Sequence, residues 1–138
     1  MTRLLALICL VSLAACASTK ALLETGSEGE IIYNDEGGEL LEYMRRVTRA
    51  KAPRIVGLCG SACTLYLSHP NVCIGRGATL VFHQASNVDG TFNAVGTAYL
   101  IGHYPQAIQH WIVEQGGLRK QELKMNARTA RRFMRRCT

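Results

Sequence analysis

The sequence lacks a hydrophobic run long enough to cross a bilayer as a stable helix. The apolar stretch from Leu4 to Ala14 follows the basic residue Arg3 and is too short for a membrane span. A short apolar run behind a positive charge is typical of a secretory signal peptide. We therefore expect an exported protein whose signal peptide comprises residues 1–15.

The end of this segment, Leu13-Ala14-Ala15-Cys16, resembles the lipobox of bacterial lipoproteins, in which cleavage precedes a cysteine that is then acylated. Each buried acyl methylene contributes about 0.8 kcal/mol, so acylated Cys16 would hold the protein at the periplasmic side of a bacterial membrane. The alternative is an ordinary signal peptide cut at Ala15 or Ala17. The following residues are polar and glycine-bearing as far as Gly29, so we expect residues 16–29 to form a lipidated tether.

The sequence has no internal repeat and no sign of a second domain, so residues 30–138 are expected to form one small domain.

Acidic residues are also few, with 10 Asp and Glu against 16 Lys and Arg. Much of the positive charge lies at the C-terminus, where helical spacing would align an arginine stripe comprising Arg128, Arg131, Arg132, Arg135 and Arg136. Since an exported protein rarely meets nucleic acid, we expect this stripe to face an anionic membrane, or to be a solvated terminal helix.

No Cys-x-x-Cys pair is present, and the spacing Cys59-x3-Cys63 suits zinc poorly, so we expect no metal site. Export would remove Cys9 and acylate Cys16, which leaves an even set for disulfides in an oxidising compartment: Cys59, Cys63, Cys73 and Cys137. The sequence alone leaves several pairings open. We favour Cys59–Cys73, because these residues lie on strands predicted to be neighbours.

Strands and helices alternate along the predicted domain. Apolar patterning predicts strands over residues 30–34, 54–58, 72–74 and 78–82. Helices are predicted over residues 39–49 and 61–67, and from Pro105 to Gly116-Gly117, whereas residues 84–96 are predicted to form a loop. This alternation indicates an α/β fold with a small parallel sheet and flanking helices.

Three features fall at the carboxyl ends of predicted strands, where α/β proteins carry their chemistry. Gly37-Gly38 follows the first strand, Ser61 follows the second, and His83 ends the last. A nucleophilic serine needs a base within hydrogen-bond reach and backbone N–H groups aimed at the oxyanion, and the small neighbours Gly60 and Ala62 would admit a substrate carbonyl. The alternatives are a Ser61 that caps its helix, a structural His83, and a plain glycine loop.

At these residues the sequence resembles the Clp protease proteolytic subunit and its crotonase-like superfamily. The matching motifs lie between about Glu30 and Gln84 and are Asn34-Asp35-Glu36-Gly37-Gly38, Gly57-Leu58-Cys59-Gly60-Ser61-Ala62-Cys63, and Phe82-His83-Gln84. The resemblance implies a truncated Clp protease/crotonase-like fold. It makes Ser61 the nucleophile, His83 the general base, and the N–H groups of Gly38 and Ala62 the oxyanion hole.

The same resemblance implies an exported serine hydrolase, a peptidase that acts on peptide or protein without a cofactor, and it raises homo-oligomerisation. The family's orienting aspartate has no counterpart at the expected place, near Asn126 to Thr129. We consider Asn126, Glu122 and Asp89 as the third residue, since losing the orienting acid can cost a serine hydrolase orders of magnitude in rate. The alternative function is a non-catalytic periplasmic lipoprotein that uses this fold as a binding or assembly module.

Overall fold

The computed structural model describes residues 29–138, so the predicted signal peptide, Cys16 and nearly all of the predicted tether lie outside the described residues. Within this range, no helix combines the length and the apolar character needed to cross a membrane. The elements in chain order are β1 (Ile31–Asp35), α1 (Leu40–Arg49), β2 (Arg54–Gly60), the 3-10 helix η1 (Ser61–Ser68), β3 (Cys73–Ile74), β4 (Thr79–Phe82), α2 (Ala94–His103), α3 (Gln106–Glu114), β5 (Leu123–Asn126) and α4 (Ala127–Phe133).

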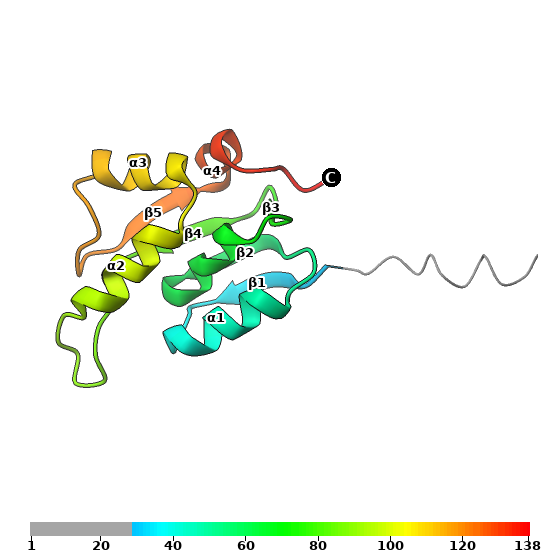
Figure 1. Ribbon diagram of the computed structural model, residues 1–138. Helices are drawn as coiled ribbons and strands as arrows, with labels where there is room; N and C mark the ends of the chain where they lie inside the picture. The colour runs from blue at the N-terminus through cyan, green and yellow to red at the C-terminus, as the bar shows by residue number, and fades with distance from the viewer. Residues whose placement is uncertain (1–28) are drawn as a thin grey trace, which may run out of the picture.

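The strands form one sheet with the order β1-β2-β4-β5, in which β3 pairs with the start of β2. Figure 1 shows β1, β2, β4 and β5 following one another across the molecule. Strands β1, β3 and β4 run parallel to β2, whereas β5 runs antiparallel to β4. The predicted α/β class with a small, mostly parallel sheet and flanking helices is therefore confirmed, and the antiparallel strand β5 is an addition to it.

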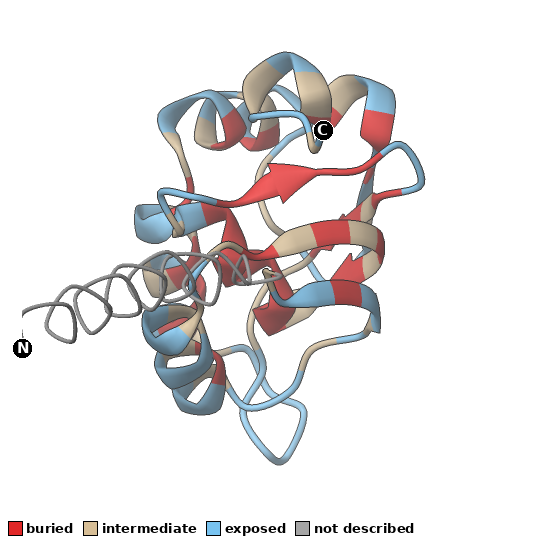
Figure 2. Ribbon diagram, turned by 90° about the vertical axis from the view of Figure 1, so that its right-hand side faces the viewer, coloured by how far each residue is buried: buried red, intermediate tan, exposed pale blue. Residues whose placement is uncertain are grey.

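The buried core lies between the sheet and the helices α1, η1, α2 and α3. Phe82 of β4 is fully buried, and its ring centroid lies 5.4 Å from that of Tyr104 and 5.9 Å from that of Trp111. Ile108 and Ile112 of α3 are also buried, as their shared helical face predicts. Strands β3 and β4 are mostly buried, whereas the loop between β4 and α2 is pale blue in Figure 2 and projects from the fold.

The prediction of a loop over residues 84–96 needs a correction at its end. Helix α2 already begins at Ala94, because the side chain of Asn93 accepts a hydrogen bond from the Gly96 N–H at 2.8 Å and so caps the first turn. The loop itself is folded back as a hairpin, with an isolated bridge between Ser86 and Phe92. The sequence predictions also missed the rest of α2 and all of β5.

The structure contains disulfides, as predicted, but not the favoured pair. Cys59 is bonded to Cys63, and Cys73 is bonded to Cys137. The reason is the register of the sheet, in which Cys73 lies opposite Arg54 at the start of β2. Cys59 lies five residues further along β2 than Arg54, a span of about 16 Å, whereas a disulfide needs Cα atoms within about 7 Å.

The predicted arginine stripe is also corrected, because helix α4 ends at Phe133. Arg128, Arg131 and Arg132 lie on α4, but Arg135 and Arg136 follow it in an extended tail. The backbone of this tail pairs with β3, since the Arg135 carbonyl accepts from Ile74 and the Cys137 N–H donates to Ile74. The Arg135 guanidinium donates to the carbonyls of Val72 and Asn71. The five arginines therefore do not share one helical face.

Candidate functional site

Ser61 lies at a sharp bend between β2 and η1. Its φ angle is +53°, the only positive φ among the described non-glycine residues. Such a conformation costs of order 1–3 kcal/mol and persists only where neighbouring contacts hold it. Two contacts hold this one: the Cys59–Cys63 disulfide closes the bend, and the Thr64 hydroxyl donates to the Ser61 carbonyl at 2.6 Å.

The buried layer beneath the bend is polar and fully satisfied. Thr64 has no solvent exposure, and its hydroxyl lies 2.6 Å from that of Tyr104, which is also buried. Burial raises the pKa of the Tyr104 phenol, so this hydroxyl stays protonated. The pair helps to hold the bend, because the Tyr104 hydroxyl without Thr64 would be a buried group with no partner.

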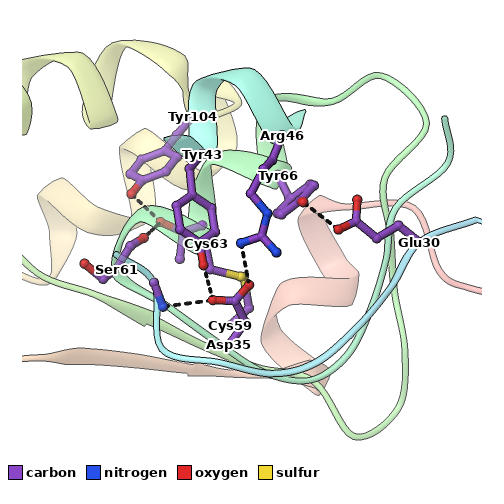
Figure 3. Close-up of a disulfide and its surroundings, with 11 residues drawn as sticks. Glu30, Asp35, Tyr43, Arg46, Cys59, Ser61, Cys63, Tyr66 and Tyr104 are labelled. Atoms are coloured by element: carbon purple, nitrogen blue, oxygen red, sulfur yellow. Dashed lines mark hydrogen bonds and ion pairs between the residues drawn. A yellow bond between two sulfur atoms is a disulfide. The ribbon is translucent and has the colours of Figure 1, made fainter. Parts of the chain in front are cut away.

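The capping role considered for Ser61 is not supported. Helix η1 begins at Ser61 itself, and Gly60 occupies the N-cap position. Among the hydrogen bonds of residues 29–138, none involves the Ser61 hydroxyl. Figure 3 shows the Ser61 side chain turned away from the cluster around Asp35. The hydroxyl is thus free to meet a ligand.

The Gly37-Gly38 turn lies directly against this bend. Gly37 has φ +87°, and a Cβ atom at this position would lie 2.7 Å from the Ser61 Cβ and 2.8 Å from the Ala62 nitrogen. Only glycine fits so close to another backbone. The register explains the contact, since Asp35 at the end of β1 pairs with Cys59 near the end of β2. The sequence prediction that both motifs meet at the carboxyl edge of the sheet agrees with this geometry.

A polar cluster supports the glycine turn from the side of α1 (Figure 3). The Asp35 carboxylate accepts hydrogen bonds from the Gly37 N–H at 2.9 Å and from the Tyr43 hydroxyl, and its second oxygen lies 3.7 Å from Arg46. The Arg46 guanidinium also lies 4.8 Å from the centre of the Tyr43 ring. Burial and the bond to Asp35 raise the pKa of Tyr43 to about 12, so the phenol remains a hydrogen-bond donor at any physiological pH.

His83 follows β4 and is held by its own neighbour. Its Nδ1 atom lies 2.7 Å from the carbonyl oxygen of Gln84. A carbonyl can only accept, so Nδ1 carries the proton and Nε2 of a neutral ring is the free acceptor. The Gln84 backbone is fixed in turn, because its N–H donates to the Arg119 carbonyl at 2.8 Å. The ring therefore has the tautomer that a general base needs.

Ser61 and His83 together line two hollows. The larger is a cleft of about 650 Å³ that is also lined by Gly38 and Ala62, with walls from α1, α2 and the hairpin. The smaller hollow, of about 390 Å³, is more charged and includes Glu36, Glu122 and Lys124. No hydrogen bond joins the Ser61 hydroxyl to the His83 ring within the described range. Catalytic hydrogen bonds are often long in the absence of substrate and tighten when it binds.

The three residues considered as the third catalytic group lie in different places. Asn126 pairs with Thr79 at the start of β4, about 13 Å along the strand from His83, and its side chain caps α4 by accepting from Thr129. Asp89 lies in the exposed hairpin and accepts from Thr91. Glu122 is the only one of the three that lines a hollow with His83.

Sequence reasoning missed the groups that hold the site in place. The Gln84 carbonyl has no signature in a sequence, because every residue carries one. Asp35 could have been suspected, since an aspartate before a glycine often accepts from the backbone two residues later.

No group of three or more metal-ligating side chains occurs in residues 29–138.

No protein-family model matches the sequence, and no curated protein is significantly similar to it. The fold and the site therefore define a mixed α/β protein with a serine, a histidine and a glycine turn at the carboxyl edge of its sheet. The similarity to the Clp protease and crotonase-like superfamily stays a prediction from the motifs.

Proposed function

We propose that the protein is an exported serine hydrolase, a peptidase of the Clp protease and crotonase-like type, that acts through an acyl-enzyme on Ser61. The observation that carries the proposal is the common cleft lined by Ser61, His83, Gly38 and Ala62. The positive φ of Ser61 adds to it, because strained backbone at a cleft is typical of functional positions.

The reaction would proceed in two steps. Nε2 of His83 takes the Ser61 proton as the hydroxyl oxygen attacks the substrate carbonyl, and the N–H groups of Gly38 and Ala62 donate to the oxyanion. The protonated ring then gives this proton to the departing amine, which leaves the acyl group on Ser61. Water activated by His83 attacks the ester, and the carboxylic acid leaves with the serine restored. The Gln84 carbonyl keeps Nδ1 protonated throughout.

The lining of the larger cleft favours a peptide or protein substrate with apolar side chains. Its walls include Leu40, Met44 and Leu100, and the exposed residues Leu41, Val88 and Val95 lie at its surface. An apolar segment bound there would bury these side chains, at roughly 25 cal/mol for each Å² removed from water.

The proposal includes the cellular setting expected from the sequence. Acylated Cys16 would hold the protein at the periplasmic side of a bacterial membrane, and the arginines of α4 and of the tail would lie near anionic lipid. The reaction above needs neither cofactor nor nucleic acid. Homo-oligomerisation stays part of the proposal.

The second candidate is a non-catalytic lipoprotein that binds or assembles with a partner through the same cleft. The absence of a Ser61–His83 hydrogen bond within residues 29–138 favours this candidate. The apolar surface around the cleft would suit either role.

A fluorophosphonate probe separates the two candidates. For a hydrolase, we expect purified protein without the signal peptide to be labelled, and labelling to be lost in Ser61→Ala and in His83→Ala. Ser86→Ala is the matched control, because Ser86 is an exposed serine in the same cleft and the variant should be labelled like the wild type. A wild type that resists labelling throughout the near-neutral pH range would contradict the hydrolase and leave the binding module.

A further inference from the structure

The Asp35 carboxylate is bonded to both sides of the predicted oxyanion-binding turn. It accepts from the Gly37 N–H at 2.9 Å, and it also accepts from the Tyr43 hydroxyl. The Tyr43 ring flanks Gly38, because a Cβ atom at Gly38 would lie 3.6 Å from its edge. One side chain therefore contacts both the Glu36–Gly37 peptide and the tyrosine ring beside Gly38.

The turn has little freedom once Asp35 is in place. Gly37 is pressed against Ser61 and Ala62, so its backbone cannot move toward the bend. The bond from its N–H to Asp35 opposes rotation of the Glu36–Gly37 peptide. The Gly38 N–H lies in the next peptide plane, so its direction depends on the dihedral angles of Gly37, which these two contacts restrain.

A carboxylate so close to a developing oxyanion would normally oppose it. Here the charge is compensated, since Arg46 lies 3.7 Å from the second carboxylate oxygen. The Asp35 side chain is 19% exposed, so this pair is screened less than a fully solvated one would be. Asp35 can thus order the turn at little electrostatic cost to the reaction.

We propose that Asp35 is a positioning residue. It acts through Gly37 and Tyr43 to keep the Gly38 N–H directed at the oxyanion that forms when Ser61 attacks the substrate carbonyl. This inference rests on the proposed hydrolase function. It adds a role for a residue outside the predicted serine, histidine and glycine set.

The structure supplies a matched control for this role. Glu30 accepts a hydrogen bond from the Tyr66 hydroxyl at 2.8 Å, a second pairing of a carboxylate with a buried tyrosine. Glu30 does not line either hollow beside Ser61 and makes no hydrogen bond to the glycine turn within residues 29–138. Loss of the Glu30 bond should affect packing without affecting the oxyanion site.

The test measures hydrolysis of p-nitrophenyl butyrate and the rate of fluorophosphonate labelling. We expect Asp35→Ala to lower kcat by about 10- to 100-fold, less than the loss of a whole oxyanion donor, with KM changed by less than about threefold. Asp35→Asn should recover most of kcat, because its amide oxygen still accepts from Gly37. Glu30→Ala should match the wild type in both assays.

The outcomes separate this inference from the function on which it rests. A wild type that neither turns over the ester nor reacts with the probe overturns the proposed hydrolase itself. An active wild type whose Asp35→Ala variant keeps its kcat, or loses it no more than Glu30→Ala does, overturns the positioning role alone. If Asp35→Ala fails to fold in a thermal melt, Asp35→Asn decides, and a folded Asp35→Asn with kcat as low as that of Ser61→Ala contradicts the proposal.

Discussion

The Nδ1 atom of His83 donates to the backbone carbonyl of Gln84, the next residue in the chain, across 2.7 Å. In a serine hydrolase triad a carboxylate occupies this place, fixes the tautomer and stabilises the imidazolium that forms. A carbonyl does the first task fully and the second only in part, because it carries no net charge. For the proposed hydrolase, this pairing supplies the tautomer without an acid, and we expect a slower reaction than a carboxylate would allow.

Glu122→Gln should have little effect on the reaction. Glu122 is exposed and paired with Lys124 at 3.3 Å. Such surface pairs contribute about 0–1 kcal/mol to the stability of the fold. We expect fluorophosphonate labelling within about threefold of the wild-type rate, a change of less than 1 kcal/mol in the barrier. A loss of more than about tenfold would instead make Glu122 the group that orients His83.

Gly37→Ala should inactivate the protein more than its backbone angle alone explains. Gly90 is the matched control, because its φ of +80° is close to the +87° of Gly37 and a Cβ atom there would meet nothing within 4 Å. We expect Gly90→Ala to lower the free energy of unfolding by about 1 kcal/mol. Its labelling should equal that of the wild type. Gly37→Ala should cost more in urea unfolding and abolish labelling, and equal effects of the two variants would contradict the contact with Ser61.

Much of this architecture could be predicted where the apolar pattern is regular. A short apolar run around Ile32 predicts β1, the apolar residues around Ile55 predict β2, and the spacing of apolar residues along α1 predicts that helix. Helix α2 could not be predicted in this way, because its own apolar residues and glycines are distributed over all of its faces. Only the Asn93 cap marks its start. Strand β5 does alternate, with Leu123 and Met125 more buried than their neighbours, but four residues are too few for a clear signal.

The candidate site was predictable to the extent that parallel strands bring their carboxyl ends together. That rule alone predicts that Ser61, His83 and Gly37-Gly38 gather at one edge. The disulfides could not be derived, because their pairing depends on register, and register depends on which residues face the core. The Gln84 carbonyl and the buried Thr64–Tyr104 pair depend on backbone positions that only the folded chain defines.

The Cys73–Cys137 disulfide should contribute more to stability, and the Cys59–Cys63 disulfide should contribute more to activity. Cys73–Cys137 closes a sequence separation of 64 and joins the C-terminal tail to β3, whereas Cys59–Cys63 spans a separation of 4. In the chain-entropy account the longer loop gives about 4 kcal/mol of unfolding free energy and the shorter about 2 kcal/mol. Because the short loop encloses Ser61, we expect Cys59→Ala/Cys63→Ala to lose more labelling and Cys73→Ala/Cys137→Ala to lose more stability. Urea unfolding and labelling of both double variants check this, and the same order in both measurements would contradict it.

The pKa of Tyr43 makes the stability of the fold fall in alkaline solution. Below pH 10 the phenol is protonated in both the folded and the unfolded chain, but between pH 10 and 12 only the folded chain keeps the proton. The unfolded state then binds fewer protons, so unfolding becomes easier as the pH rises through this range. Tyr66 and Tyr104 also have raised pKa values and contribute to the same loss.

A substitution separates the part that belongs to Tyr43. Tyr43→Phe should be less stable than the wild type below pH 10, because the bond to Asp35 is lost. The difference in urea midpoint should shrink as the pH rises toward 12, since only the wild type loses the contribution of this phenol. Tyr33→Phe is the control, because Tyr33 is 72% exposed on β1, and its difference from the wild type should stay constant. A Tyr43→Phe difference that also stays constant would mean that the Asp35 bond does not hold the proton on Tyr43, and it would weaken the case for Asp35 as the residue that orders the glycine turn.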